Sequence, residues 1–245
     1  MRPIVIIPTR LGSTRLPGKA LTDINGRPMI AHVWHRGLEA DIGPVVAACG
    51  DQAIVDVISD LGGLAVLTDV ALPTGSDRAH AALGLIDPEG RHDIVVVLQG
   101  DLPTIDAATV QATLAPLTRA PECAIATLAT EIEDPLELQA PQVVKTALAI
   151  EPGETIGRAV YFSRAVIPAG SGKHYHHVGV YTYRREALAR YVSLPRGILE
   201  QRESLEQLRA IEAAMRIDAT VIETEPLGVD TLADLERARI LLAGR

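Results

Sequence analysis

The sequence predicts an α/β fold built on a largely parallel sheet, and three observations support this prediction. Short runs of β-branched and aliphatic residues alternate with segments of helical periodicity in the first half of the chain. Hydrophobic residues make up 47% of the 245 residues but aromatic residues only 3%, so the core must be aliphatic. Strands buried on both faces of a parallel sheet have this continuous aliphatic character. Alternation of strand and helix further implies right-handed crossovers between parallel strands.

In the first half of the chain, four aliphatic runs are predicted to be strands. They are residues 3–8, 45–48, 64–67 and 94–98, and the last of them (IVVVL) gives the strongest signal. Two segments are predicted to be helices because their apolar residues recur at helical spacing: one that begins at Pro28 and one over 52–61. Residues 9–19 are predicted to form a loop, since glycine and proline interrupt any regular structure there.

The second half of the chain is less regular. Strands are predicted at 124–128, 143–148, 178–183 and 220–222, and helices at about 199–216 and at 232–242. Residues 170–173 are predicted to be an exposed loop tip because they are rich in glycine. No internal repeat, low-complexity tract or long linker divides the sequence, so we predict a single domain over residues 1–245.

Composition excludes several classes of protein. The formal net charge of −8 argues against a general nucleic-acid-binding protein, which usually carries a basic surplus. No apolar run reaches the length of a membrane span, and we find no signal peptide before the first strand, so a cytoplasmic protein without a membrane partner is expected. The two cysteines, Cys49 and Cys123, lie in apolar runs and are expected to be reduced thiols in the core.

The loop after the first strand carries three cations and two glycines in the sequence RLGSTRLPGK, from Arg10 to Lys19. Ligands of open α/β sheets bind outside the carboxyl ends of the strands, where this loop is expected to lie. Glycine lets backbone N–H groups approach phosphate oxygens, and cations neutralise a polyphosphate. The spacing is not that of a P-loop. The pattern favours a phosphate-binding loop, with a solvated basic loop as the alternative.

Two carboxylates follow strand-like stretches. Asp101 ends the sequence Gln99-Gly100-Asp101 after the strongest predicted strand, and Asp230 follows a second such stretch near the end of the chain. Magnesium is typically held by one or two carboxylates together with phosphate oxygens and water. The two residues are therefore candidate metal ligands in one crevice. The alternative is that each aspartate caps the helix that follows it.

A group of histidines and tyrosines lies in the second half of the chain. His174, His176 and His177 follow Lys173, and Tyr181 and Tyr183 come next. The spacing of the histidines fits no usual zinc site. The pattern therefore favours a surface loop in which one histidine points to a ligand.

Several motifs together resemble the 3-deoxy-manno-octulosonate cytidylyltransferases, also called CMP-Kdo synthetases. They occur in the order of that family and cover nearly the whole chain: IIPTRLGSTRLPGKAL, INGRPMIAHV, LPTGSDR, LQGDLPTI, AVYFSRAVIP, HHVGVYTYRREAL, SLEQLRAIE and GVDTLADLERAR. The loop motif is shared with other sugar nucleotidyltransferases. YFSRAVIP and SLEQLR, with a terminal VDT, are much more specific to the Kdo enzymes.

The resemblance implies a three-layer α/β/α nucleotidyltransferase fold, Rossmann-like, with a mixed and mostly parallel sheet. It implies an enzyme that transfers CMP from CTP to 3-deoxy-D-manno-octulosonate (Kdo) and releases pyrophosphate, with Mg2+ as cofactor, activating Kdo for lipopolysaccharide synthesis. It also implies a homodimer whose contacts and sugar-binding elements come from the second half of the chain. For the dimer we expect the segment 161–168, because apolar residues near it would need burial: Val160, Phe162, Val166 and Ile167.

The resemblance also implies roles for individual residues. The CTP phosphates would be held by Arg10, Ser13, Thr14 and Lys19. Arg15 would lie near the reacting phosphate and sugar, and Arg78 near the nucleotide; Arg15, Lys19 and Asp101 would be the catalytic residues. Asp101 and Asp230 would bind magnesium. The Kdo pocket would be lined by Gln99, His177, Tyr181, Glu206 and Gln207.

The chain departs from the family pattern at Leu102, at Cys49-Gly50 and at Ala140-Pro141-Gln142. Other readings therefore stay open. One is a cytidylyltransferase for a related acidic sugar, such as 8-amino-Kdo or a sialic-acid-like sugar. A glycosyltransferase would usually carry an Asp-x-Asp motif after a strand, and a nucleotide sensor would not need the carboxylates at 101 and 230.

Overall fold

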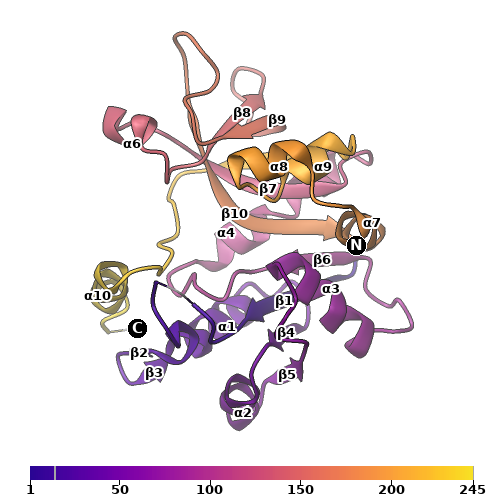
Figure 1. Ribbon diagram of the computed structural model, residues 1–245, viewed down its shortest axis with the longest axis vertical. Coiled ribbons are helices and arrows are strands. Elements are labelled where there is room, and N and C mark those ends of the chain that lie inside the picture. The colour runs from indigo at the N-terminus through magenta and orange to yellow at the C-terminus, as the bar shows by residue number, and fades with distance from the viewer. Residues whose placement is uncertain (14, 245) are drawn as a thin grey trace. The chain divides into compact units, whose positions relative to one another are not determined.

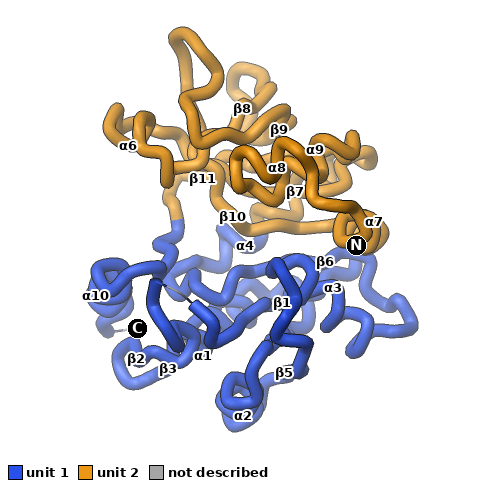
Figure 2. Tube along the Cα trace, in the orientation of Figure 1, with its two compact units in different colours: residues 1–111, 226–245 blue, residues 112–225 orange. Residues whose placement is uncertain are grey.

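The computed structural model describes residues 1–13 and 15–244, and these fall into two compact units (Figures 1 and 2). Unit 1 comprises residues 1–111 and 226–245, and unit 2 comprises residues 112–225. The chain therefore leaves unit 1 once and returns to it for its last 20 residues. That the two units fold as one domain stays a prediction.

The sheet of unit 1 has the strand order β5-β4-β1-β6, and its neighbouring strands are all parallel, as predicted. Its strands are β1 (Pro3–Thr9), β4 (Val45–Cys49), β5 (Leu64–Leu67) and β6 (Ile94–Val97). The side chains of β4 and β6 are buried throughout, as the aliphatic composition requires. Strand β5 lies at the edge, and Leu64 and Leu67 are about half exposed there.

Helices pack on this sheet and complete unit 1. They are α1 (Met29–Glu39), α2 (Gln52–Asp60), α3 (Gly75–Ile86), α4 (Ala107–Ala112, ending at the unit boundary) and α10 (Leu232–Leu241), with a short 3-10 helix η1 (Lys19–Leu21) and the ribbon β2 (Asp23–Ile24) and β3 (Arg27–Pro28). Helix α3 was not predicted from the sequence. Its start is fixed by a capping box, in which the Thr74 hydroxyl and the Asp77 carboxylate each accept a hydrogen bond from the other's backbone N–H.

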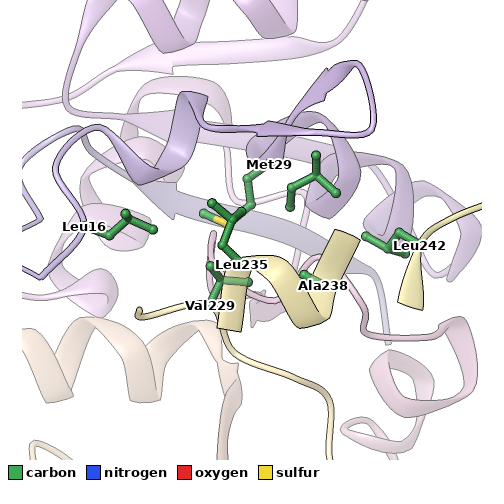
Figure 3. Close-up of a cluster of buried hydrophobic side chains, with 7 residues drawn as sticks. Leu16, Met29, Val229, Leu235, Ala238 and Leu242 are labelled. Carbon is green, nitrogen blue, oxygen red and sulfur yellow. The ribbon is translucent and has the colours of Figure 1, made fainter. Parts of the chain in front are cut away.

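The last helix packs against the start of the chain (Figure 3). Leu235, Ala238 and Leu242 form one buried cluster with residues from the loop after β1, from β2, from α1 and from the segment before α10: Leu16, Ile24, Met29 and Val229. Leu16 lies between Arg15 and the loop's proline, and Val229 directly precedes Asp230. This apolar packing therefore brings the cationic loop and Asp230, far apart in sequence, to the same place.

The sheet of unit 2 has the order β10-β7-β11-β9-β8, and here the prediction of a largely parallel sheet is wrong. Only β7 and β11 run parallel; the pairs β10–β7, β10–β8, β11–β9 and β8–β9 are antiparallel. Its strands are β7 (Ile125–Glu131), β8 (Lys145–Ala149), β9 (Ile156–Ser163), β10 (Tyr175–Arg184) and β11 (Ile217–Ile222). Strand β9 was not predicted.

The helices of unit 2 are short, and the predicted long helix over 199–216 is wrong. The structure has α5 (Ala115–Arg119), α6 (Pro135–Gln139), α7 (Arg185–Ser193), α8 (Ile198–Glu203) and α9 (Leu208–Glu212). Ser204 ends α8 with a φ of 55°, in the left-handed region, which turns the chain before α9 begins. A buried ion pair between Glu200 of α8 and Arg209 of α9, 2.7 Å apart, joins the two pieces.

Both cysteines are buried and unpaired, as predicted. Burial raises the pKa of each thiol, Cys49 and Cys123, to about 12, so neither is reactive near neutrality. Within residues 1–13 and 15–244, every helix is too short or too polar to cross a membrane.

Candidate active site

A cleft of about 410 Å³ lies in unit 1 at the carboxyl ends of β1 and β6. Its lining includes residues of the loop after β1, of the start of α3, of the segment after β6 and of the segment before α10: Arg10, Gly12, Ser13, Arg15, Lys19, Thr74, Gly75, Arg78, Gln99, Gly100, Asp101 and Asp230. The structure thus brings together the residues of unit 1 that the sequence analysis singled out. Thr14 lies outside the described residues.

Lys19 joins the two candidate metal ligands. Its Nζ donates to Asp101 Oδ2 at 2.7 Å, to Asp230 Oδ1 at 3.0 Å and to the carbonyl of Val229 at 3.2 Å. Burial alone would lower the pKa of Lys19, but the charges and hydrogen bonds of the two carboxylates outweigh it and the pKa is raised. Lys19 is therefore a fixed cation, with its three donors all used.

Arg15 adds a second cation to one of these carboxylates. Its guanidinium lies 2.9 Å from Asp230 Oδ2, while about two thirds of the side chain remains exposed. Asp230 thus bridges Lys19 and Arg15 through its two oxygens. An exposed pair of this kind contributes little to stability, so Arg15 can exchange Asp230 for another anion at small cost.

The alternative reading of the two aspartates as helix caps is wrong. The Asp101 side chain binds Lys19 and lies well before α4, whose first turn is closed by Asp106. Helix α10 is capped by Thr231, which forms a capping box with Asp234. Neither carboxylate therefore accepts the backbone N–H hydrogen bonds that a helix cap accepts.

The cationic loop is supported by a residue that the sequence analysis did not single out. Asp51 Oδ2 accepts a hydrogen bond of 2.8 Å from the backbone N–H of Leu11 and so holds the first turn of the loop. The adjacent Gly50 explains one departure from the family pattern: a Cβ there would lie 3.0 Å from Arg10 Cβ and 3.1 Å from Arg78 Nη1. Glycine lets the two arginines approach closely.

Arg78 is almost fully buried and has two functions in the cleft. Its guanidinium donates to Thr68 Oγ1 at 2.6 Å and to the carbonyl of Asp69 at 3.1 Å, which fixes the segment after β5. Burial, and then the charge of Arg10, lower its pKa, although an arginine remains protonated at any working pH. Arg10 and Arg78 together make this end of the cleft positive.

Gln99 and Ser13 complete the cleft. The side-chain amide of Gln99 lies beside Gly75, where an added Cβ would be 3.2 Å from Gln99 Oε1. Ser13 Oγ accepts from the backbone N–H of Leu16 at 3.3 Å, so its hydroxyl hydrogen is available to a ligand.

The remaining predicted sugar-binding residues lie in unit 2. His177 and Tyr181 are buried neighbours on β10, with ring centroids 5.5 Å apart. Burial raises the pKa of Tyr181 well above its usual value, and the charge of Glu206 raises it further, which places Glu206 beside that ring. Gln207 follows, almost fully buried, and its Nε2 has no hydrogen-bond partner among the described residues. A buried amide donor without a partner is costly unless a ligand satisfies it.

The expectation of a histidine-bearing surface loop is wrong. His176 and His177 belong to strand β10, and only the preceding residues, 170–173, are exposed as predicted. His174 Nε2 donates to the carbonyl of Pro168, and His176 pairs with Glu225 at 2.8 Å. In the part of the chain that the structure describes, no group of three His, Cys, Asp or Glu residues could hold a metal ion.

Comparison with known proteins identifies the family. The cytidylyltransferase family model matches residues 4–217. The 3-deoxy-manno-octulosonate cytidylyltransferase of Paramagnetospirillum magneticum is 54% identical over 99% of this chain and 98% of its own length. That of Rhodospirillum centenum is 58% identical over 99% and 94%.

This chain belongs to the 3-deoxy-manno-octulosonate cytidylyltransferases. A solved structure agrees: a CMP:2-keto-3-deoxy-manno-octonic acid synthetase complexed with CTP matches 99% of each chain at 36% identity, with a TM-score of 0.90. The fold is accordingly the mixed α/β fold of the nucleotidyltransferases. For a 3-deoxy-manno-octulosonate cytidylyltransferase, the cleft of unit 1 is the natural candidate for the nucleotide site.

Two carboxylates of this cytidylyltransferase fit a divalent cation. Asp101 and Asp230 both accept a hydrogen bond from one atom, Lys19 Nζ, so their oxygens face one point. Their side chains are 32% and 42% exposed, which leaves room for water and phosphate oxygens to complete an octahedral shell. With two carboxylates rather than three or more protein ligands, the donor set suits Mg2+ bound together with a nucleotide.

Proposed function

We propose that this enzyme transfers CMP from CTP to Kdo and releases pyrophosphate, which activates Kdo for lipopolysaccharide synthesis. The observation that carries this proposal is the convergence of Lys19, Asp101 and Asp230 in a cation-lined cleft. The anomeric hydroxyl oxygen of Kdo attacks the α-phosphorus of CTP. The bond from that phosphorus to the bridging oxygen breaks, pyrophosphate leaves with the bonding electron pair, and the hydroxyl proton passes to solvent.

The protein's part in this reaction is to position two anions and to offset their repulsion. Arg10, Ser13, Thr14 and Lys19 hold the phosphates of CTP, and Arg78 lies near the nucleotide. Arg15, an exposed cation of the cluster, meets the reacting phosphate and the Kdo carboxylate. Transfer of a phosphoryl or nucleotidyl group depends on such positioning and charge neutralisation more than on covalent help from the protein.

We propose Asp101 and Asp230 as the ligands of Mg2+. When bound, the ion supplies positive charge for the phosphate oxygens and the leaving pyrophosphate. Lys19 pairs with both carboxylates in the free protein and Arg15 pairs with Asp230, so the cations and the metal compete for them.

Gln99 of unit 1 is proposed to bind Kdo, as are His177, Tyr181, Glu206 and Gln207 of unit 2. Support comes from unit 2, where His177, Tyr181 and Glu206 are neighbours and the Nε2 of Gln207 is a buried donor in need of an acceptor. A sugar acid offers carboxylate and hydroxyl groups that match these donors and acceptors.

We further propose the three-layer α/β/α arrangement, a cytoplasmic location and a homodimer. The parallel sheet of unit 1 and the helices packed on it support the first. The expectation that apolar residues near 161–168 need burial by a second chain holds only in part. Phe162 is fully buried within the chain itself, whereas Val160 is 47% exposed.

The substrate is tested by pyrophosphate release with CTP and Mg2+ in the presence of Kdo, 8-amino-Kdo or N-acetylneuraminic acid, with the sugar nucleotide identified by mass spectrometry. We expect the highest kcat/KM with Kdo and no turnover when sugar, CTP or Mg2+ is left out. Equal turnover with N-acetylneuraminic acid, or release that needs no sugar, would refute the proposal. A preference for 8-amino-Kdo would move the assignment to that analogue.

A further inference from the structure

Strand β10 carries an irregularity opposite Thr127 of strand β7. Val178 pairs with Leu128 and Thr182 pairs with Ala126, so three residues of β10, 179–181, lie opposite Thr127 alone. A bulge of this size leaves backbone groups without ladder partners. The Thr127 side chain meets them: its Oγ1 lies 3.1 Å from the carbonyl oxygen of Val178 and 2.9 Å from that of Val180.

The same hydroxyl also contacts the ring of His177. Thr127 Oγ1 lies 3.0 Å from His177 Nε2, and both residues are buried. A hydroxyl has one hydrogen and two lone pairs. The two carbonyl oxygens can only accept, so the single hydrogen of Thr127 is directed to them. Nε2 must then donate, and the hydroxyl oxygen accepts.

The opposite assignment is unfavourable. If Thr127 donated to Nε2, the two carbonyl oxygens would each face an oxygen lone pair at about 3 Å, and neither would receive that hydrogen. Losing the hydrogen bond to a buried carbonyl costs roughly 1–3 kcal/mol. The bulge therefore selects one tautomer of a neutral imidazole, and burial keeps the ring neutral because it lowers the pKa of His177 to about 3.

The other ring nitrogen, Nδ1, is then an unprotonated acceptor. Among the described residues it has no hydrogen-bond partner, and it is not one of the fully enclosed polar atoms, so it is the ring atom left to accept a hydrogen bond from a ligand. Two aromatic rings pack against the imidazole: the ring of Phe162 is nearly perpendicular to it with centroids 4.9 Å apart, and the ring of Tyr181 is tilted with centroids 5.5 Å apart. These contacts help to hold the ring in place.

We propose that Thr127 is a positioning residue that fixes His177 as the Nε2–H tautomer, so that Nδ1 accepts a hydrogen bond from a hydroxyl of the sugar. This assignment of the ligand atom rests on the proposed function. It predicts a polarity for the pocket: His177 contributes an acceptor, while Gln207 Nε2 contributes a donor. A site with such buried polar groups rejects an analogue that lacks the matching hydroxyl, because the protein atom is then left unpaired.

The tautomer is measured directly by nitrogen NMR on protein labelled with 15N-histidine, with the His177 signals assigned by their loss in His177→Gln. We expect a proton on Nε2 and a bare Nδ1 in the free enzyme between pH 6 and 8. A proton on Nδ1, or on both nitrogens, would overturn the proposal. This measurement needs no substrate, so it stands or falls independently of the proposed reaction.

The link to the sugar is tested with two variants of Thr127. Thr127→Val keeps the shape but removes the hydroxyl, and Thr127→Ser keeps the hydroxyl. We expect Thr127→Val to populate the Nδ1–H tautomer and to raise the KM for Kdo about tenfold, as for the loss of one hydrogen bond, with the KM for CTP unchanged. Thr127→Ser should resemble the unmodified enzyme in both readouts.

The outcomes separate this proposal from the reaction itself. An equal rise of both KM values, or a Thr127→Val protein with an unaltered tautomer and unaltered KM for Kdo, would overturn the role of Thr127. If the unmodified enzyme shows no turnover with Kdo, the proposed function fails. The proposed sugar contact then fails with it, even where the tautomer is as expected.

Discussion

At the scale of single residues, Lys19 organises the candidate active site. One ammonium group bonds two carboxylates that are far apart in the sequence, and only 17% of its side chain is exposed. Without that charge, Asp101 and Asp230 would repel each other, because like charges that share a site disfavour ionisation. In the free protein, the ammonium group of Lys19 therefore occupies the position that we assign to Mg2+ in the working enzyme.

Replacing Lys19 by methionine should separate its role in turnover from its neutralisation of the two carboxylates. We expect turnover to fall about a hundredfold or more, and the free energy of unfolding to fall by about 1 kcal/mol. Added Mg2+ should raise the melting temperature of Lys19→Met more than that of the unmodified protein, since the metal then neutralises unpaired carboxylates. Lys19→Arg is the charge-matched control. A Lys19→Met protein with normal turnover and an unchanged response to Mg2+ would contradict this role.

The lowered pKa of His177 predicts how the free energy of unfolding depends on pH. Its pKa is 6.5 in an ordinary environment and about 3 in the fold, because burial disfavours the charged ring. Above pH 6.5 the two states bind the same number of protons there. As the pH falls from 6.5 towards 3, only the unfolded chain gains the proton, so stability drops by up to about 1.4 kcal/mol per pH unit.

The measurement is urea unfolding at several pH values between 4 and 8. His177→Gln keeps an amide donor for Thr127 but cannot titrate, so its stability should fall less steeply over the acid range. Identical pH profiles for the two proteins would show that His177 is protonated in the fold as readily as in the unfolded chain.

At the scale of elements, sequence periodicity predicted the strands of unit 1 well and those of unit 2 poorly. Strands β1, β4, β5 and β6 are continuous aliphatic runs, and such runs are informative without knowledge of their neighbours. Strand β9 (IGRAVYFS) alternates buried and exposed positions weakly and contains a glycine and an arginine. Its place is decided by pairing with β8, the preceding strand, and with β11, which lies far along the chain.

The break between α8 and α9 shows the same limit. Helical periodicity continues through Ser204, so the sequence favours one long helix, but the structure turns there in a left-handed conformation. The turn brings Glu200 and Arg209 together, and Arg209 also lies over the ring of Tyr191 at 5.0 Å. These tertiary contacts outweigh the local preference for one long helix, and no local sequence pattern predicts them.

Ser204→Gly tests whether this turn is strained. A left-handed conformation costs roughly 1–2 kcal/mol for a residue with a side chain, and glycine lacks that cost but loses more entropy on folding. We expect Ser204→Gly to raise the free energy of unfolding by about 0.5–1 kcal/mol, and Ser204→Ala to leave it nearly unchanged. Chemical denaturation measures both. A destabilised glycine variant would mean that the serine side chain, rather than the turn, stabilises the junction.

At the scale of the whole molecule, the residues of the candidate site were predictable from the sequence but their bonding was not. The family motifs pointed to Lys19, Asp101 and Asp230 from the sequence alone. That Lys19 joins the two carboxylates, that Asp51 supports the loop and that Thr127 contacts His177 all depend on contacts across 40 or more positions, which one sequence does not reveal. The wrong expectation for Phe162 has the same origin, since its burial comes from within the chain.

The homodimer is a prediction about the assembled molecule. If the segment 161–168 lies in a dimer contact, then Val160→Asp should weaken the assembly, because Val160 is among the exposed apolar residues near it. Light scattering at micromolar concentration should show a dimer for the unmodified chain and more monomer for the variant. Monomer alone in the unmodified protein would contradict the prediction, and an exposed Leu136→Asp serves as a control on another surface.

We propose that Asp101 and Asp230 serve a metal-dependent transfer rather than the fold. The decisive measurement is turnover of Asp101→Asn and Asp230→Asn against Mg2+ concentration, beside a melting curve of each variant. Asparagine keeps the size and one oxygen but loses the charge. We predict a loss of turnover of about a hundredfold or more. The free energy of unfolding should change by less than about 1 kcal/mol, since one carboxylate remains for Lys19. Near-normal turnover of either variant at limiting Mg2+ would contradict the claim for that residue.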